Sequence, residues 1–182
     1  MSRLPQLDPA KLAGRQKEIY DKIVDSPRGG VRGPFGVLLH APGVADPVQA
    51  LGAYLRFDSV LPGRLRELAI LITARFWTAQ FEWHIHRGFA EKEGLDPAII
   101  DAIAARQTPE FHAADEKVVY AYCRELHKQH RVSDATYADA VKVLGAEAVV
   151  ELTALNGYYT LISMVLNAFE VPVPTGEAPL GD

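Results

Sequence analysis

The sequence predicts an all-α protein, and three observations lead to this prediction. Apolar residues recur through most of the chain at the three- and four-residue spacing of helices. Runs that favour strands are nearly absent. Residues that begin and end helices stand at the borders of the periodic stretches, as Gly94 and the pair Asp96 and Pro97 do.

The first third of the chain predicts helical segments on both sides of one loop. Ile19, Tyr20 and Ile23 have helical spacing, and so do Val48, Leu51 and Leu55. Between these stretches, dense Gly and Pro residues break any regular element. The expected order is a helix at 14–25, a loop at 26–34, a short helical turn at 35–41 and a helix at 44–59.

The remaining helices follow from periodicity and caps. Gly94 is suited to end one helix, and Asp96 with Pro97 to begin the next. Either Ser133 or Asp134 caps a later helix. The expected helices span 61–77, 79–93, 96–104, 114–130, 134–144 and 146–169. The Pro-rich tail, 171–182, should be extended or loose. No repeat or linker divides the chain, so 1–182 is expected to form one domain.

Composition narrows the function classes. The formal net charge of −4 leaves no basic stripe, so nucleic acid is not an expected partner. The first residues lack the apolar core of a signal peptide, and a cytoplasmic location is expected. The apolar run 149–169 approaches membrane-spanning length, but it contains Glu151, Asn156 and Asn167, each costly in hydrocarbon. A buried helix, with no membrane contact, is the better interpretation.

Three titratable residues on neighbouring predicted helices carry the chemistry. Glu82 and His86 are four residues apart and therefore share one helix face. Glu67 lies on the preceding helix among apolar neighbours, where an unpartnered carboxylate is strongly disfavoured. Two acids and an imidazole in an apolar setting suit proton transfer. The alternatives are a surface pair of Glu82 with His86, and a structural ion pair of Glu67 with a nearby arginine.

Other reactive groups give weaker signals. His84 falls on the far side of the helix from Glu82, so it is expected at the surface or an interface. His127 and His130 resemble a solvated helix end, and no metal site is predicted. Cys123 is the single cysteine, which excludes a CxxC redox pair and an intrachain disulfide.

Three segments of the chain form a recognisable pattern: Arg66-Glu-Leu-Ala-Ile-Leu, Ala79-Gln-Phe-Glu-Trp-His-Ile-His86 and Gly94-Leu95. This pattern resembles the carboxymuconolactone decarboxylase family, which includes the alkylhydroperoxidase D (AhpD) proteins, and the resemblance covers about 45–105. It implies an AhpD-like bundle of about seven to nine helices. It also implies a homotrimer or homohexamer.

The same resemblance implies that thiol peroxidase activity is absent. Where the peroxidase branch has the two cysteines of a CxxC pair, this chain has Ala79 and Glu82. The pattern is similar instead to the decarboxylase branch, whose site is thiol-free and works without a cofactor. The implied activity is that of a lyase of aromatic-compound degradation, acting on a small carboxylated lactone or keto acid.

These residues give a hypothesis for catalysis. His86 is the expected general acid and base, held in one tautomer by Glu67 or Glu82, while the other carboxylate relays the proton. Trp77, Trp83 and Tyr159 are candidate walls of the substrate pocket, each weighed against core packing. Arg32 is the candidate group for a substrate carboxylate, weighed against a solvated loop arginine. The competing class is a non-catalytic helical oligomer that binds a small ligand.

Overall fold

The computed structural model of the protein describes residues 2–181. Within that range the chain forms nine α helices and no β strand, so the predicted all-α class is confirmed. The helices are α1 (Gly14–Val24), α2 (Pro34–Leu38), α3 (Pro42–Ala53), α4 (Gly63–Phe76), α5 (Gln80–Lys92), α6 (Pro97–Ala104), α7 (Ala114–Gln129), α8 (Asp134–Leu144) and α9 (Ala146–Ala168). Two short elements join them: a 3-10 turn, η1 (Pro9–Lys11), and a π-helical turn, η2 (Tyr54–Asp58).

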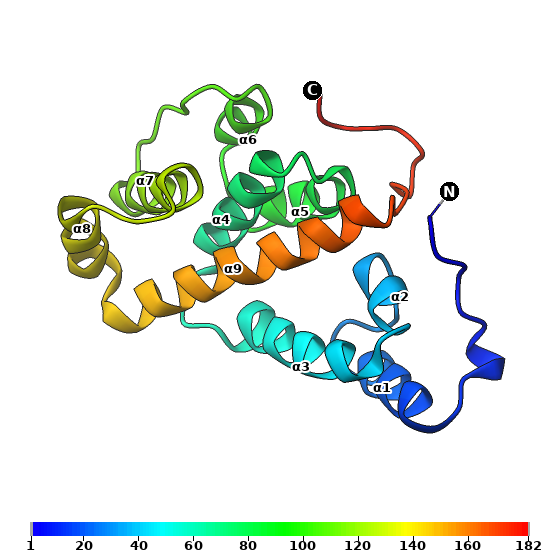
Figure 1. The fold of residues 1–182 in the computed structure, drawn as a ribbon. Coiled ribbons are helices and arrows are strands. Elements are labelled where there is room, and N and C mark those ends of the chain that lie inside the picture. The colour runs from blue at the N-terminus through cyan, green and yellow to red at the C-terminus, as the bar shows by residue number, and fades with distance from the viewer. Residues whose placement is uncertain (1, 182) are drawn as a thin grey trace.

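The long helix α9 organises the bundle. It crosses the molecule between α4 to α8 on one side and α1 to α3 on the other (Figure 1). Helix α4 contacts α5, α6, α7 and α9, and α9 also contacts α2, α3, α5 and α8. The two helices therefore form the central pair on which the rest of the fold packs.

Helix α4 is buried because its sequence is apolar on nearly every side. Leu68, Ile70 and Leu71 are fully enclosed, and every residue from Glu67 to Arg75 is buried. A helix that is hydrophobic all round belongs in the interior of a protein. This placement takes Glu67 into the core along with its apolar neighbours.

The predicted helix borders are reproduced closely, since caps determine them. The Asp96 side chain accepts a hydrogen bond from the amide of Ala98 at 2.8 Å, and Pro97 occupies the first turn. Ser133, and not Asp134, caps α8 by accepting a hydrogen bond from the amide of Thr136. Gly94 has a φ of 83°, the left-handed conformation that suits glycine after a helix.

The structure differs from the prediction in two places. One helix was expected at 44–59, but helix α3 begins at Pro42 and continues into the π-helical turn η2. Leu51, expected on the apolar face of this helix, is 46% exposed. The tail is not loose throughout. The Gln80 side chain accepts a hydrogen bond from the amide of Leu180 and donates one to the carbonyl oxygen of Leu180, both at 2.8 Å. Leu180 is buried.

Helix α9 is long and apolar enough to cross a membrane, but this is weak evidence. Its residues Leu152, Leu155 and Ile162 are buried in the hydrophobic core, and it packs on α4 along its length. These contacts are those of a core helix, in agreement with the sequence interpretation.

The loop between α1 and α2 needs glycine where it approaches α5. Gly33 has φ 55° and ψ −122°, a conformation that L-residues with side chains rarely adopt. A Cβ atom at Gly33 would lie 2.4 Å from the ring of Phe81. The loop can therefore pack against α5 only because this residue has no side chain.

We predict that Gly33→Ala destabilises the protein by more than about 2 kcal/mol, through backbone strain and the clash with Phe81. Gly29→Ala is the matched control, because Gly29 also has a positive φ of 65° but has open space around its Cβ position. That control should lose only about 1 kcal/mol. Urea unfolding of both variants measures the difference, and equal losses would show that the contact with Phe81 is not tight.

Candidate active site

His86 lies between two carboxylates. Its Nδ1 atom is 2.6 Å from Oε2 of Glu67, and its Nε2 atom is 2.9 Å from Oε1 of Glu82. Both ring nitrogens are thus engaged, which fixes the orientation of the imidazole. The prediction left open which glutamate pairs with His86, and the structure shows that both do.

Two adjoining helices bring these groups together. Glu82 and His86 are one turn apart on α5, so their side chains lie on the same face. Glu67 is on α4, which packs against α5, and it reaches the imidazole from the other side. The geometry excludes a surface pair, because Glu67, Glu82 and His86 are 4%, 5% and 2% exposed.

Glu67 has no arginine partner within the described residues. Arg64 pairs instead with Asp115 and Glu116, and Arg75 donates from Nε to the carbonyl oxygen of Ala104. His86 is the group that compensates the buried carboxylate of Glu67. The structural alternative of a Glu67–arginine pair is therefore wrong.

Burial and charge act on His86 in opposite directions. Burial alone would lower the pKa of its imidazole, but attraction and hydrogen bonding to Glu67 and Glu82 outweigh burial and raise the pKa to about 9. The imidazole is consequently protonated at neutral pH. The site therefore contains a cation between two acids at that pH.

Aromatic rings close the site. The ring of Tyr159 meets the His86 imidazole edge-on, with 5.1 Å between centroids and 84° between planes. Phe89 lies on another side at 5.8 Å. Tyr159 is itself buried, and burial raises its pKa well above the ordinary value, so its hydroxyl stays protonated.

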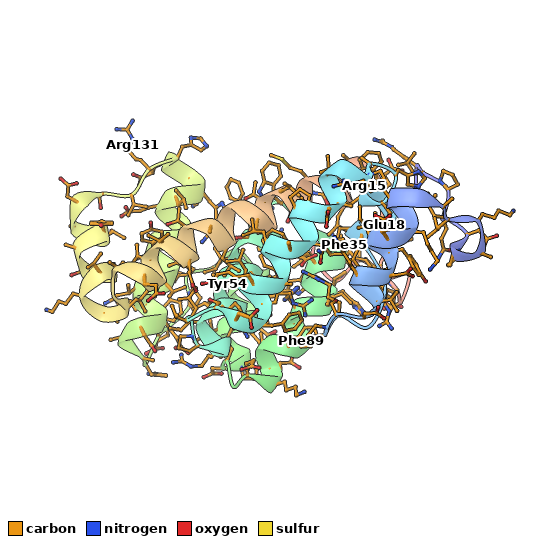
Figure 2. All side chains as sticks on the ribbon, turned by 90° about the horizontal axis from the view of Figure 1, so that it is seen from below. Arg15, Glu18, Phe35, Tyr54, Phe89 and Arg131 are labelled. Carbon is orange, nitrogen blue, oxygen red and sulfur yellow. The ribbon has the colours of Figure 1, made fainter. Side chains whose placement is uncertain are left out.

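A cavity of about 870 Å³ opens beside the three titratable residues. Its lining includes Glu82, His86 and Tyr159, but not Glu67. Phe35 and Phe89, labelled in Figure 2, add apolar wall from α2 and α5. The cavity size suits a small organic molecule. The three titratable residues therefore have unequal positions, with Glu82 and His86 at the cavity and Glu67 behind them.

Three arginines line the same cavity. Arg32, the predicted carboxylate-binding residue, is among them but is exposed. Arg28 lies over the ring of Phe35 with its Cζ 4.6 Å from the centroid, and Arg56 lies over Phe89 at 5.4 Å. The sequence analysis did not identify Arg28 and Arg56. The only indication in the sequence was an aromatic residue close in the chain, Phe35 for Arg28 and Phe57 for Arg56.

Two predicted wall residues lie elsewhere, and one unpredicted residue takes part. Trp83 is fully buried in the hydrophobic core and does not line the cavity. Trp77 ends α4, donates from its indole to Thr160 at 3.4 Å, and does not line the cavity either. His84, expected on the far side, is half-buried and contributes to the wall. Helix geometry placed His84 opposite Glu82 on α5, but it could not show that the cavity extends around the helix as far as His84.

A second buried polar cluster lies apart from this cavity. The Thr73 hydroxyl contacts Nε2 of His127 at 2.9 Å, and Asn156 donates to the Cys123 sulfur at 3.3 Å. His127 was expected on a solvated helix end, but it is buried. Burial raises the pKa of the Cys123 thiol to about 12. Within residues 2–181, no group of three or more His, Cys, Asp and Glu side chains is placed to hold a metal ion.

Comparison with known proteins gives matches at the level of fold. No family model matches the chain, and no curated protein does. Solved structures do match. An AhpD-core, uncharacterized peroxidase-related protein from Ralstonia eutropha JMP134 has a TM-score of 0.77 at 17% identity, over 94% of this chain and 92% of its own. A peroxidase-related protein from Silicibacter sp. TM1040 has a TM-score of 0.76 at 12% identity, over 98% and 95%.

A third solved structure is a protein of unknown function from Agrobacterium tumefaciens, described as a putative antioxidant defence protein AhpD. It has a TM-score of 0.67 at 16% identity, over 79% of this chain and 99% of its own. These identities are low, so the likeness concerns the fold. The chain has the AhpD-like all-α fold that its sequence predicted.

The raised pKa of His86 predicts how stability depends on pH. A proton bound more tightly in the folded state stabilises fully below the unfolded pKa of 6.5, and that stabilisation is lost as pH rises toward 9. We expect the free energy of unfolding to fall by about 2 kcal/mol between pH 6.5 and 8.5. The measurement is urea unfolding at several pH values.

The control for this prediction is the triple variant Glu67→Gln, Glu82→Gln and His86→Gln, because replacing His86 alone would leave two buried carboxylates that titrate in its place. The stability of this variant should vary much less over the same pH range. A cysteine in an unfolded chain has a pKa of about 8.5, and this contribution cancels because both proteins contain Cys123. A wild-type profile parallel to that of the triple variant would contradict the raised pKa of His86.

Proposed function

We propose that this protein is a cofactor-independent acid–base enzyme resembling 4-carboxymuconolactone decarboxylase, and that it acts on a small carboxylated lactone or keto acid. The observation that carries the proposal is the hydrogen-bonded series Glu67–His86–Glu82, whose last two members line a cavity with three arginines. The fold shared with AhpD-like structures supports membership of the same superfamily.

The positions of the three titratable residues suggest separate roles. Glu82 and His86 line the cavity and can exchange a proton with a bound substrate. Glu67 lies behind His86, where it orients the imidazole and stabilises its positive charge. Glu67 is thus a positioning residue, and Glu82 and His86 are the proposed catalytic residues.

The reaction proceeds in two steps. First, the bond between the substrate carbon and its carboxylate breaks, carbon dioxide leaves, and the electron pair passes into the conjugated carbonyl system. Second, that carbon takes up a proton from the Glu82–His86 pair, which is then reprotonated from solvent. A protonated His86 at neutral pH supplies this proton, and its charge also stabilises the developing anion.

The arginines support an anionic substrate. A guanidinium group binds a carboxylate through two parallel hydrogen bonds. Arg28 is better held than Arg32, because it stacks on Phe35 whereas Arg32 is exposed. Arg56 is held in the same way over Phe89, next to His86. Substrate carboxylates would therefore meet Arg28 and Arg56, with Arg32 at the outer edge.

A peroxidase-related role is the alternative suggested by the descriptions of the structural neighbours. Thiol peroxidases need an accessible thiolate. Cys123 is the single cysteine, is fully buried, and has a pKa raised to about 12 by burial. This observation favours acid–base chemistry over a thiol mechanism.

Assembly into a homotrimer or homohexamer is part of the proposal, with a cytoplasmic location. Helix α9 carries Val150 and Met164, which are 69% and 47% exposed, although the helix is otherwise a core element. We infer that these exposed apolar side chains of α9 are covered by another subunit. A non-catalytic oligomer that binds a small ligand is the remaining alternative, and turnover separates it from an enzyme.

We predict that His86→Gln lowers decarboxylation by roughly 10²- to 10⁴-fold, since a positioned acid contributes about that much. Glu82→Gln should cause a loss of similar size. The assay is carbon dioxide release from a panel of carboxylated lactones and keto acids, first selected by thermal stabilisation of the wild-type protein.

The controls are His112→Gln, which removes an exposed imidazole, and Cys123→Ala, which removes the only thiol. Both should retain wild-type turnover, and circular dichroism should show intact helices in every variant. Full activity in His86→Gln would refute the assignment. Decarboxylation lost in Cys123→Ala alone would show that the thiol, and not His86, is needed for this reaction.

The proposed assembly predicts that Val150→Glu weakens subunit association, because it places a charge on an exposed apolar position of α9. Light scattering coupled to size-exclusion chromatography should show a trimer or hexamer for the wild type and smaller species for the variant. A monomeric wild-type protein would contradict the proposal.

A further inference from the structure

A second pocket, of about 160 Å³, lies where the end of α4 meets α6 and α7. It shares no lining residue with the cavity beside His86. Its charged lining residues are all basic, and no acidic residue contributes to the lining. Its cationic side chains are Arg75, Arg106, Arg124 and Lys128. In a chain of net charge −4, this local excess of positive charge needs an explanation.

Arg75 is the only buried residue among these four cations. It is 5% exposed, its Nε donates to the carbonyl of Ala104 at 2.8 Å, and its Nη1 donates to Thr78 at 3.2 Å. No carboxylate within residues 2–181 forms an ion pair with it, whereas Arg64 and Arg87 each pair with two acids. A buried guanidinium without a counter-charge is costly.

A second guanidinium lies beside the first. The Thr78 hydroxyl accepts hydrogen bonds from Arg75 and also from Nη2 of Arg106, the latter at 3.0 Å. One oxygen atom therefore holds two like charges close together. Burial, and then the charge of Arg106, lowers the pKa of Arg75, which reflects the same unfavourable arrangement.

Two helix ends meet at this pocket. Thr78 and Arg106 have φ values of 47° and 59°, in the left-handed region. Each stands just after the C-cap of a helix, α4 or α6, where a left-handed residue commonly ends the helix. These helix ends bring the Arg106 guanidinium within hydrogen-bonding distance of the Thr78 hydroxyl.

We propose that this pocket binds a small tetrahedral oxyanion, such as inorganic phosphate or the phosphoryl group of a small molecule. Arg75 and Arg106 present planar donor groups that match its oxygen atoms, and Arg124 and Lys128 add charge from α7. The volume lies below the range of about 300–1,000 Å³ typical of drug-sized ligands, so the ligand is small.

The groups next to this pocket do not neutralise the positive charge of its arginines and lysine. His127 is stacked on Phe76 at 4.9 Å, and burial lowers the pKa of its imidazole, so it is neutral at pH 7 and forms a wall. The nearby acid Glu125 accepts hydrogen bonds from Ser133 and Thr136. Arg124 bonds the Thr108 hydroxyl at 3.2 Å, which leaves its charge uncompensated.

The test is titration of the full chain with inorganic phosphate at constant ionic strength, followed by calorimetry and by amide NMR. We expect saturable binding with shifts at Thr78 and Arg106. The exposed pair Arg106→Gln and Arg124→Gln, combined in one variant, should weaken binding at least tenfold, since two charge-assisted hydrogen bonds are lost. Sulfate should compete, and the monoanion acetate should not.

Two control variants locate the binding. Arg15→Gln removes an exposed arginine from α1, at the opposite end of the molecule from α7 (Figures 1 and 2), and should bind phosphate as the wild type does. His86→Gln should also bind normally, because the two sites share no residue. Absence of saturable binding, unchanged affinity in the double variant, or shifts confined to the His86 cavity would overturn the proposal.

Discussion

The buried ion pairs of His86 with Glu67 and Glu82 are the interaction on which the site depends. Two carboxylates in a dry helical interface are tolerated only because a cation lies between them, and the imidazole stays cationic only because they surround it. Each half of this arrangement offsets the cost of burying the other. Because the pKa of His86 is raised to about 9, its imidazole keeps its proton at neutral pH, where an ordinary histidine would lose it.

The fold supplies the conditions for that interaction. Helix α4 takes Glu67 into the core because it is apolar on all sides, and α5 presents Glu82 and His86 on the face that meets α4. The loop from α1 and helix α9 complete the cavity with Arg28 and Tyr159. Glu82 and His86 thus line the same cavity as the arginines, and Arg56 lies over Phe89, the ring beside His86.

The helix borders and the pairing of Glu82 with His86 could be predicted from the sequence, because both depend on residues close together in the chain. Helix borders followed from local caps such as Asp96, and the alignment of Glu82 with His86 followed from helix geometry. What failed depended on contacts distant in the chain. Trp83 was expected to line the pocket but lies in the core, because large rings suit both places. Arg28 was missed because only the folded loop brings it to the cavity.

The protonation state of His86 tests the account most directly. Nitrogen-15 NMR of the imidazole reports separately on Nδ1 and Nε2 as pH changes. The account predicts that both nitrogens carry protons at pH 7 and that the ring titrates near pH 9. A neutral ring at pH 7, protonated on one nitrogen and titrating at or below 6.5, would contradict it.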